Sequence, residues 1–213
     1  MQSGALDQGQ PSRMSGPNRR QQIVAVAAEL FARKGFSGTT TKEIAEGAGV
    51  SEAIIFRHFA SKETLYAAIL DYKVKQGTER MKAQLEEAAG RKDDHAFFGS
   101  LALEMLDFHS KDRTFMRLLL FSALEGHELS NIFFDSTARD IKNHIRKYIK
   151  QRISDGAFRS IDPAVAARAF VGMVLHQVQA STIFTDDDVK LSNRQIADRF
   201  VEIFLNGVRE SES

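Results

Sequence analysis

Residues 41–62, TKEIAEGAGVSEAIIFRHFASK, contain the spacing that decides the fold of this chain. The small residue Ala45 stands four positions before Gly49, and the apolar Ile55 follows Gly49 by six positions. Two short helices that cross at about 90 to 120° need a small residue at their contact, a glycine at the turn and apolar residues that hold the second helix. The spacing predicts a helix-turn-helix hairpin, which by itself is compatible with DNA binding or with a purely structural role.

Capping residues and glycines divide the sequence before this hairpin. Asn18, with Gln21 three residues later, has the pattern of a capping box, and it predicts a first helix that Gly35 ends. The hydroxyls of the three threonines at 39–41 can cap a second helix over residues 42–48. The first two helices of a three-helix unit are therefore expected here.

Two serines mark the next helix starts. Ser51 can cap a third helix through Phe59, and Ser61 can cap a fourth that ends at Gly90. The fourth helix carries an apolar stripe made of Leu65, Ile69 and Tyr72. Further amphipathic helices are expected at residues 95–109, 113–125, 129–153, 163–184 and 192–206. The sequence predicts an all-α fold of about nine helices.

Composition narrows the function classes. The chain has no cysteine, which excludes disulfides, thiolate nucleophiles and cysteine-ligated metal sites. Residues 1–17 are rich in Gln, Ser and Gly without an apolar run, so we expect a disordered arm and not a signal peptide. No stretch approaches the roughly 20 apolar residues of a membrane span. We expect a cytoplasmic protein with no cofactor, no metal and no membrane partner.

The charge is unevenly distributed along the chain. Residues 1–62 contain eight Lys and Arg against five Asp and Glu, so they carry +3, whereas the whole chain carries +1. The remaining residues therefore carry −2. A basic end on a slightly acidic body is typical of a protein that presents one end to phosphates, although solvated faces often show imbalances of this size.

The longer stretch FARKGFSGTTTKEIAEGAGVSEAIIFRHFASKETLY, residues 31–66, closely resembles the N-terminal domain of the tetracycline-repressor (TetR) family, and the likeness extends over about residues 20–70. It is carried by Gly35-Phe36, Thr40-Thr41, Ile44-Ala45, Ala48-Gly49-Val50-Ser51, His58-Phe59 and Ser61-Lys62-Glu63. The resemblance implies a helix-turn-helix DNA-binding domain at residues 18–64 and an effector-binding and dimerisation domain at residues 65–213.

The resemblance also implies roles for residues of the hairpin. The third helix would enter the major groove as a recognition helix, with the second lying across the backbone. Phosphate contacts are implied for Thr41, Ser51, His58 and Lys62, the last adding its ammonium to a helix N-terminus. Base contacts fit Glu52 with a cytosine amine, Ala53 and Ile54 with thymine methyls, and Arg57 with guanine or a phosphate.

Phe56 departs from the family pattern. Family members usually carry a tyrosine at this position, and its hydroxyl normally reaches a phosphate. Phe56 cannot make that hydrogen bond, so one backbone contact of the DNA-binding set is in doubt. Ala53 likewise replaces a more frequent glycine, which favours the helix slightly and narrows the approach to DNA.

The body matches the family in architecture only, and the resemblance implies that its middle helices enclose an effector. An apolar or aromatic effector would fit a lining of Phe97, Phe98, Met105, Phe108, Phe115, Phe121, Phe134 and His176. His109 and His144 are alternative polar anchors. Most of these rings are equally compatible with ordinary core.

The last two expected helices are strongly apolar, and in the family they form a four-helix bundle with a second subunit. The dimerisation residues are then Phe170, Val171, Val174, Val178, Ile196, Phe200, Ile203 and Phe204, with an intrachain core as the alternative. A homodimer would place two recognition helices about 34 Å apart on a near-palindromic operator of double-stranded DNA. The fourth helix, which joins Lys62 to the body, would transmit effector binding.

Two other function classes would use the same sequence in other ways. A metal-assisted hydrolase would use the EGHE segment at residues 125–128, but that segment lacks the two-histidine helical spacing of zinc hydrolases. An interaction protein would use the hairpin to contact another protein, and its binding would not fall steeply with salt as DNA binding does. The sequence favours a ligand-responsive repressor over both.

Overall fold

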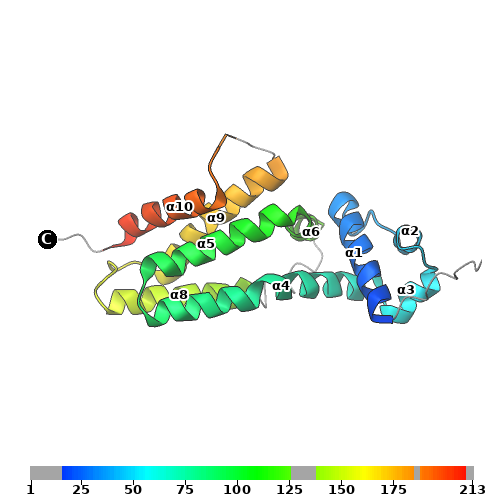
Figure 1. Cartoon of the computed structure of the whole chain (residues 1–213), viewed down its shortest axis with the longest axis horizontal. Helices are drawn as coiled ribbons and strands as arrows, with labels where there is room; N and C mark the ends of the chain where they lie inside the picture. Colours follow the sequence, from blue (N-terminus) through cyan, green and yellow to red (C-terminus); the bar gives the residue numbers. More distant parts are fainter. Residues whose placement is uncertain (1–15, 126–137, 185–187, 210–213) are drawn as a thin grey trace, which may run out of the picture.

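The computed structural model describes residues 16–125, 138–184 and 188–209 (Figure 1). Over these residues it contains nine α-helices and one π-helical turn, and an antiparallel bridge between Phe158 and Arg209 is their only β pairing. The all-α fold class is confirmed. Within the same residues, no helix combines the length and apolarity that crossing a membrane requires.

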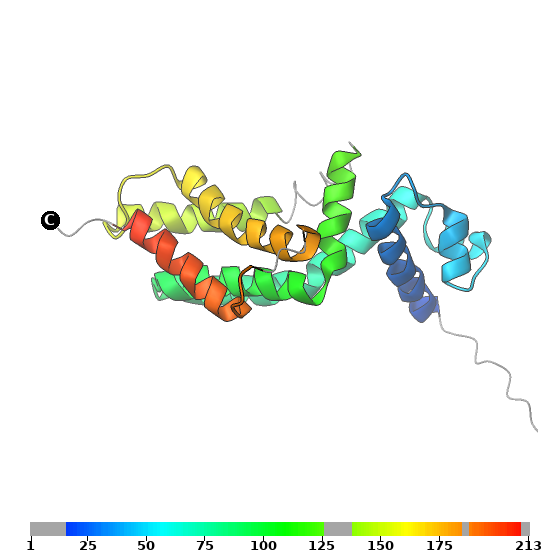
Figure 2. The same ribbon diagram turned by 90° about the horizontal axis from the view of Figure 1, so that it is seen from above.

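The elements follow one another along the chain as α1 (Gly16–Lys34), α2 (Thr41–Gly47), α3 (Glu52–His58), α4 (Lys62–Gly90), α5 (Asp94–Lys111), α6 (Arg113–Leu124), α8 (Arg139–Ser154), α9 (Pro163–Gln179), η2 (Ala180–Phe184) and α10 (Asn193–Val208). Figure 1 shows α1 to α3 gathered at one end, with α4 running from them into the body. The helical body of α5, α8, α9 and α10 forms the other end (Figure 2).

Local capping chemistry sets the start of two helices as predicted. The Thr40 hydroxyl accepts a hydrogen bond from the Glu43 amide at 3.2 Å, and the Glu43 carboxylate accepts one from the Thr40 amide at 2.9 Å. Ser61 caps α4 in the same reciprocal way with Thr64. Each pair satisfies amides that the first helical turn leaves without a partner, which fixes both helix starts from sequence-local contacts.

Several local expectations were wrong. α1 begins at Gly16, so Asn18 lies inside the helix and cannot cap it. Pro17 is tolerated there because first-turn amides have no intrahelical partner. Ser51 occupies the N-cap position of α3 but makes no side-chain capping bond. Tyr72 is 46% exposed and does not belong to the buried stripe of α4.

Other predicted segments lie partly outside the described residues. Only 16 and 17 of the expected arm are described, and both are helical. The helix expected at 129–153 is observed as Arg139–Ser154, with 129–137 outside the described residues. The helix expected at 163–184 changes to π geometry after Gln179, where the Thr182 hydroxyl donates to the carbonyl of Val178 at 2.5 Å. Such back-bonding offers the backbone an alternative to regular α-helix.

The described residues form two hydrophobic cores, and the N-terminal core includes residues of α4 and α6 that lie beyond residue 64. The N-terminal core combines α1 to α3 with Leu65, Tyr66, Ile69 and Leu70 of α4 and with Phe115, Leu118 and Leu119 of α6. α6 packs against α1, so this core is closed by a helix of the body. The second core fills the body and includes the remaining buried residues of α4, α5 and α8 to α10.

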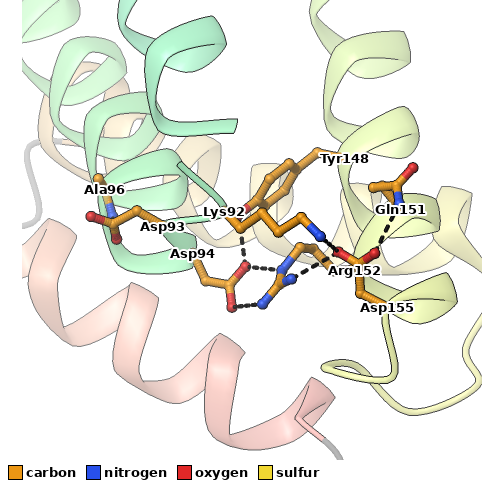
Figure 3. A network of polar contacts seen from close by, with 8 residues as sticks. All are labelled: Lys92, Asp93, Asp94, Ala96, Tyr148, Gln151, Arg152 and Asp155. Atoms are coloured by element: carbon orange, nitrogen blue, oxygen red, sulfur yellow. Dashed lines mark hydrogen bonds and ion pairs between the residues drawn. The ribbon is translucent and has the colours of Figure 1, made fainter. Parts of the chain in front are cut away.

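A polar network joins the start of α5 to the end of α8 (Figure 3). The Asp94 carboxylate accepts hydrogen bonds from the Tyr148 hydroxyl at 2.7 Å and from Arg152 Nε at 2.8 Å. Arg152 Nη1 also bonds Asp155 at 3.0 Å, and Lys92 pairs with the same carboxylate at 3.1 Å. The pKa of Tyr148 is raised, mainly by burial and to a smaller extent by the hydrogen bond to Asp94. The ion pairs of Asp94 and Asp155 with Arg152 and Lys92 hold the start of α5 against the end of α8.

Candidate functional site

The exposed face of α3 is narrow and defined by helical spacing. Glu52, Ala53, Phe56 and Arg57 are all exposed, and they recur at positions i, i+1, i+4 and i+5. On the opposite side Ile55 is buried in the N-terminal core, which locks α3 against α1 and α2. The hairpin therefore presents a small face with one acid, one arginine and one aromatic ring.

Ile54 does not belong to that face. It was predicted to read a base with Ala53, but its side chain is half-buried and packs against the N-terminal core. The physical reason is that the four exposed residues span an arc of about 140° around α3, and Ile54, like the buried Ile55, lies outside that arc. Ile54 contributes chiefly to holding α3 in place.

Thr41 and Glu52 contact one another in the free chain. The Thr41 hydroxyl donates to the Glu52 carboxylate at 2.6 Å and so joins the first residue of α2 to the first residue of α3. Hydrogen bonds to a carboxylate are stronger than neutral ones. The two DNA-contact candidates are therefore held together across the turn, which fixes the direction of the carboxylate.

Lys62 does not extend toward solvent as a phosphate contact requires. Its ammonium donates to the carbonyls of Phe36 at 2.7 Å and Thr39 at 2.9 Å, and it lies 4.2 Å from the centre of the Phe36 ring. Both carbonyls belong to the loop between α1 and α2. The prediction is corrected to this extent: in the unbound chain Lys62 holds that loop, because its long side chain reaches the two loop carbonyls.

His58 is half-buried at the end of α3, and its Nε2 atom is buried without a hydrogen-bond partner in the described part of the chain. The guanidinium of Arg20 lies 4.9 Å from the neighbouring Phe59 ring, so α1 places a positive charge beside this end of α3. A phosphate oxygen is a suitable partner for both groups.

The C-terminal end of α6 contacts the loop that Lys62 also holds. The Glu125 carboxylate accepts hydrogen bonds from the amides of Phe36 at 3.1 Å and Ser37 at 3.3 Å. Gly35 has φ +75°, and a Cβ there would lie 2.3 Å from the Glu125 carboxylate. Of the EGHE segment, only Glu125 lies within the described residues, and its role there is structural.

Two further hydrogen bonds connect α6 to α1 and α4, the helices that lie on either side of the hairpin in the chain. Arg117 Nε donates to the carbonyl of Ala32 near the end of α1 at 2.8 Å, and the Tyr66 hydroxyl of α4 donates to the carbonyl of Leu118 at 2.7 Å. Burial raises the pKa of Tyr66 to about 12, so the hydroxyl stays a donor. A displacement of α6 must therefore move α1 and α4 or break these bonds.

Three of the predicted effector-lining rings, Phe97, Phe98 and Phe115, are core residues. Phe97 stacks on Tyr148 with ring centres 3.9 Å apart, and Phe98 lies 4.8 Å from the rings of both Phe170 and Phe204. Phe97, Phe98 and Phe115 are all buried against other side chains of the same chain, and their place in an effector lining stays a prediction.

The remaining lining candidates are scattered. Met105 and Phe108 of α5 are partly buried, and Met105 packs against the body core whereas Phe108 packs against the N-terminal core. Phe121 lies beside Gly35 at the junction with the hairpin. His176 is exposed on α9, and Phe134 lies outside the described residues.

His109, one of the alternative anchors, is the unusual group in this region. It is buried, its Nδ1 atom has no hydrogen-bond partner among the described residues, and its ring stacks on that of Phe115 at 5.9 Å. Burial lowers the pKa of His109 from 6.5 to about 4, although the nearby Asp112 charge acts in the opposite direction. A buried imidazole without a partner is costly, so its site is suited to a ligand that supplies one.

The burial of His109 predicts a loss of stability in acid. Because the pKa is about 4 in the folded chain and 6.5 in the unfolded chain, the unfolded chain binds the proton first, and stability present above pH 6.5 is lost as pH falls toward 4. Between about pH 7.5 and pH 5 this group should cost about 2 kcal/mol of unfolding free energy. Urea unfolding at both pH values should show that the His109→Phe variant escapes this loss of unfolding free energy, whereas the control variant His176→Gln does not. Equal losses in the wild type and both variants would assign the effect to other titratable groups.

The predicted dimer residues divide by burial. Phe170, Val174, Val178, Ile196 and Phe204 are buried in the core of the single chain, so their side chains are not available to a second copy. Val171 and Phe200 are partly buried, and Ile203 is 61% exposed. Apolar periodicity alone cannot separate a helix face that packs inside the chain from one that packs outside it.

The structure also forms a groove of about 390 Å³ between α5 and α10, which the sequence did not indicate. It is lined by His95, Ala96, Gly99, Ser100, Arg194, Asp198 and Val201. These residues are close only because α5 and α10 pack side by side, so no sequence spacing signals them. Across the described residues, no group of three or more His, Asp or Glu side chains is arranged to hold a metal ion.

Comparisons with known proteins match both ends of the chain. The family model described as bacterial regulatory proteins of the tetR family matches residues 23–69. The model of the AefR-like transcriptional repressor C-terminal domain matches residues 100–207, just over half of the chain. The first match contains the hairpin, and the second contains α6 to α10.

Individual relatives agree with these matches. The HTH-type regulator YvkB of Bacillus subtilis is 27% identical over 198 residues, 92% of this chain and 98% of that protein. YerO of the same organism is 28% identical over 72% of this chain, which spans only 53% of YerO. The crystal structure of AibR with isovaleryl coenzyme A and operator DNA shares the fold, with TM-score 0.68, 23% identity and coverage of 87% of this chain and 97% of AibR.

The geometry and the matches agree on a single assignment. The hairpin of α2 and α3, its exposed polar face and the helical body occupy the places that the two family models describe. The chain therefore belongs to the TetR family of bacterial regulatory proteins, which are helix-turn-helix DNA-binding transcriptional regulators and not metal-assisted hydrolases.

Proposed function

We propose that this chain is a cytoplasmic repressor that binds a near-palindromic operator as a homodimer and is released by a small apolar or aromatic effector. The observation that carries the proposal is the exposed face of α3, which the buried Ile55 holds in a fixed orientation above α1 and α2. A rigidly supported helix with exposed polar side chains is what major-groove reading requires.

The phosphate contacts follow from the same geometry. Thr41 is the first residue of α2 and Ser51 directly precedes α3, and Arg20 and His58 lie at the other end of α3. These groups flank the base-reading face on two sides. We infer that they set the register on the DNA backbone while the α3 face reads bases.

The effector site is proposed at residues 105–109 of α5, where the two hydrophobic cores meet. Met105 packs toward one core and Phe108 toward the other, and His109 offers an unpartnered buried Nδ1 between them. An apolar ligand with one hydroxyl or carboxyl group matches this combination. The crystal structure of AibR, which shares this fold, contains both isovaleryl coenzyme A and operator DNA. It supports the proposal that this fold can bind an effector as well as DNA.

The coupling between the two sites is proposed to pass through α6 as well as α4. α6 directly follows the proposed effector segment, and its Glu125 and Arg117 hold the α1–α2 loop and the end of α1. An effector that binds better when α6 is displaced would shift the hairpins out of the spacing that the operator needs. The coupling free energy between two binding sites is usually about 1 to 3 kcal/mol, which is comparable to the net free energy of a few such hydrogen bonds.

The dimer contact is proposed on the outer face of α9, together with Ile203 of α10. Val165, Ala169, Gly172 and His176 are exposed and recur at helical spacing along one face. A Cβ on Gly172 would meet nothing within 4 Å in its own chain, so this glycine is not required by intrachain packing. Small residues at such a position permit a second helix to approach closely.

The test is selection of random duplex DNA by the purified chain at moderate salt, followed by affinity measurements against salt concentration. Enrichment of two inverted half-sites about one helical turn apart, with log-linear weakening by salt, is the expected result. Direct repeats or a single half-site would contradict the dimer, and failure to enrich any sequence would contradict operator binding. A flat salt dependence would favour the protein-interaction alternative.

A further inference from the structure

Phe56 is the one strongly apolar side chain on the exposed face of α3 among the described residues. Its side chain is 50% exposed, and it belongs to neither hydrophobic core. Packing of α3 is provided instead by Ile55 and by Phe59 just after the helix, both buried. The fold therefore gains little from a phenyl ring at this position.

The position of the ring is that of a base-reading group. Phe56 follows Glu52 by one helical turn and Ala53 by three residues, and it directly precedes the exposed Arg57. These four side chains share one face, so a DNA groove that receives Glu52 and Arg57 also receives the phenyl ring.

The chemistry of the ring limits what it can contact there. A phenyl group neither donates nor accepts a hydrogen bond, so it cannot replace the hydroxyl that reaches a phosphate in family members with tyrosine. If the ring displaced water from a polar base edge, the donors and acceptors of that edge would be left without hydrogen-bond partners. The C5-methyl of thymine is the one apolar group that bases present in the major groove.

The geometry points to Phe56 as a specificity-determining residue that selects thymine, by contact with its C5-methyl, at one position of each operator half-site. This inference rests on the proposed operator binding. The side chain of Ala53 lies on the same face and extends the apolar contact area. The ring itself carries this selectivity, and without a hydroxyl it makes no hydrogen bond to the DNA backbone.

The test removes single methyl groups from the DNA. In the selected operator, each thymine is replaced in turn by deoxyuridine, which keeps base pairing and lacks only the methyl. Affinities are measured for the wild-type chain, Phe56→Ala, Phe56→Tyr and Tyr72→Ala. Tyr72 is the matched control because it is an exposed aromatic residue of α4 outside the hairpin. Unchanged thermal unfolding of Phe56→Ala verifies that the variant is folded.

We expect one thymine per half-site at which deoxyuridine weakens wild-type binding about fourfold, and about 15-fold when both half-sites are changed. Phe56→Ala should lose that dependence at the same thymine, whereas Phe56→Tyr and Tyr72→Ala should keep it. A uniform loss of affinity in Phe56→Ala, with the deoxyuridine dependence unchanged, overturns the inference while leaving operator binding intact. Operator half-sites without thymine overturn it too, and failure to select any operator overturns both proposals.

Discussion

Phe98→Ala should lower the free energy of unfolding by about 3 to 5 kcal/mol, the largest stability effect expected from a single substitution in this chain. Phe98 is fully buried, and its ring lies 5.2 Å from Phe97 and 4.8 Å from both Phe170 and Phe204. Removal of the ring leaves a cavity between α5, α9 and α10, which cannot collapse without moving the aromatic residues of all three helices. Urea unfolding at a fixed protein concentration measures the change.

Phe56→Ala is the matched control for that experiment. It removes the same phenyl group from a half-exposed position outside both cores, so its unfolding free energy should stay within about 0.5 kcal/mol of the wild-type value. Similar losses in the two variants would mean that Phe98 does not occupy the centre of the body core.

Arg57→Ala should weaken operator binding by about 30-fold or more while leaving the fold intact. Arg57 is exposed on the reading face of α3, and a guanidinium contact to guanine or phosphate contributes about 1 to 3 kcal/mol. A dimer makes the contact twice, which doubles the free-energy loss. Fluorescence anisotropy with the selected operator over a range of salt concentrations measures both the affinity and its salt dependence.

The salt dependence separates the two roles of Arg57. If the guanidinium contacts phosphates, the slope of log affinity against log salt becomes shallower by about two in the variant dimer; if it reads guanine, the loss concentrates on operators with that guanine. Arg91→Ala removes an equivalent exposed charge at the distant corner between α4 and α5 and should bind normally. A loss below about threefold for Arg57→Ala would contradict the proposed orientation of α3.

The parts of the fold that depend on neighbouring residues in the chain were predictable. The helix-turn-helix follows from Ala45, Gly49 and Ile55, and the starts of α2 and α4 follow from Thr40 and Ser61, because turns and caps are satisfied within a few residues. Asn18 shows the limit of this reasoning. Its capping pattern was present, but α1 begins earlier, and a pattern alone cannot state which of several adjacent residues becomes the first helical one.

The assignments that depend on distant residues were less predictable. Lys62 was expected at a phosphate, yet the loop carbonyls of Phe36 and Thr39 bind its ammonium. Phe97, Phe98 and Phe170 were expected at an effector or a partner chain, yet they pack on one another or on Tyr148. A helix buries an apolar face at the same spacing whether the partner is its own core, a ligand or a second subunit.

By itself, the sequence determined the all-helical class and the hairpin, since periodicity, caps and turn glycines act over a few residues, and the family followed from the resemblance of residues 31–66 to the TetR family. Only the tertiary structure decided that α6 closes the N-terminal core, that Glu125 and Lys62 hold the same loop, and that Phe56 is exposed. It also decided that His109 is buried and that its Nδ1 atom finds no hydrogen-bond partner among the described residues. The reason is that burial and hydrogen-bond partners depend on which helices meet in space, and those contacts join residues that lie up to 89 positions apart in the chain.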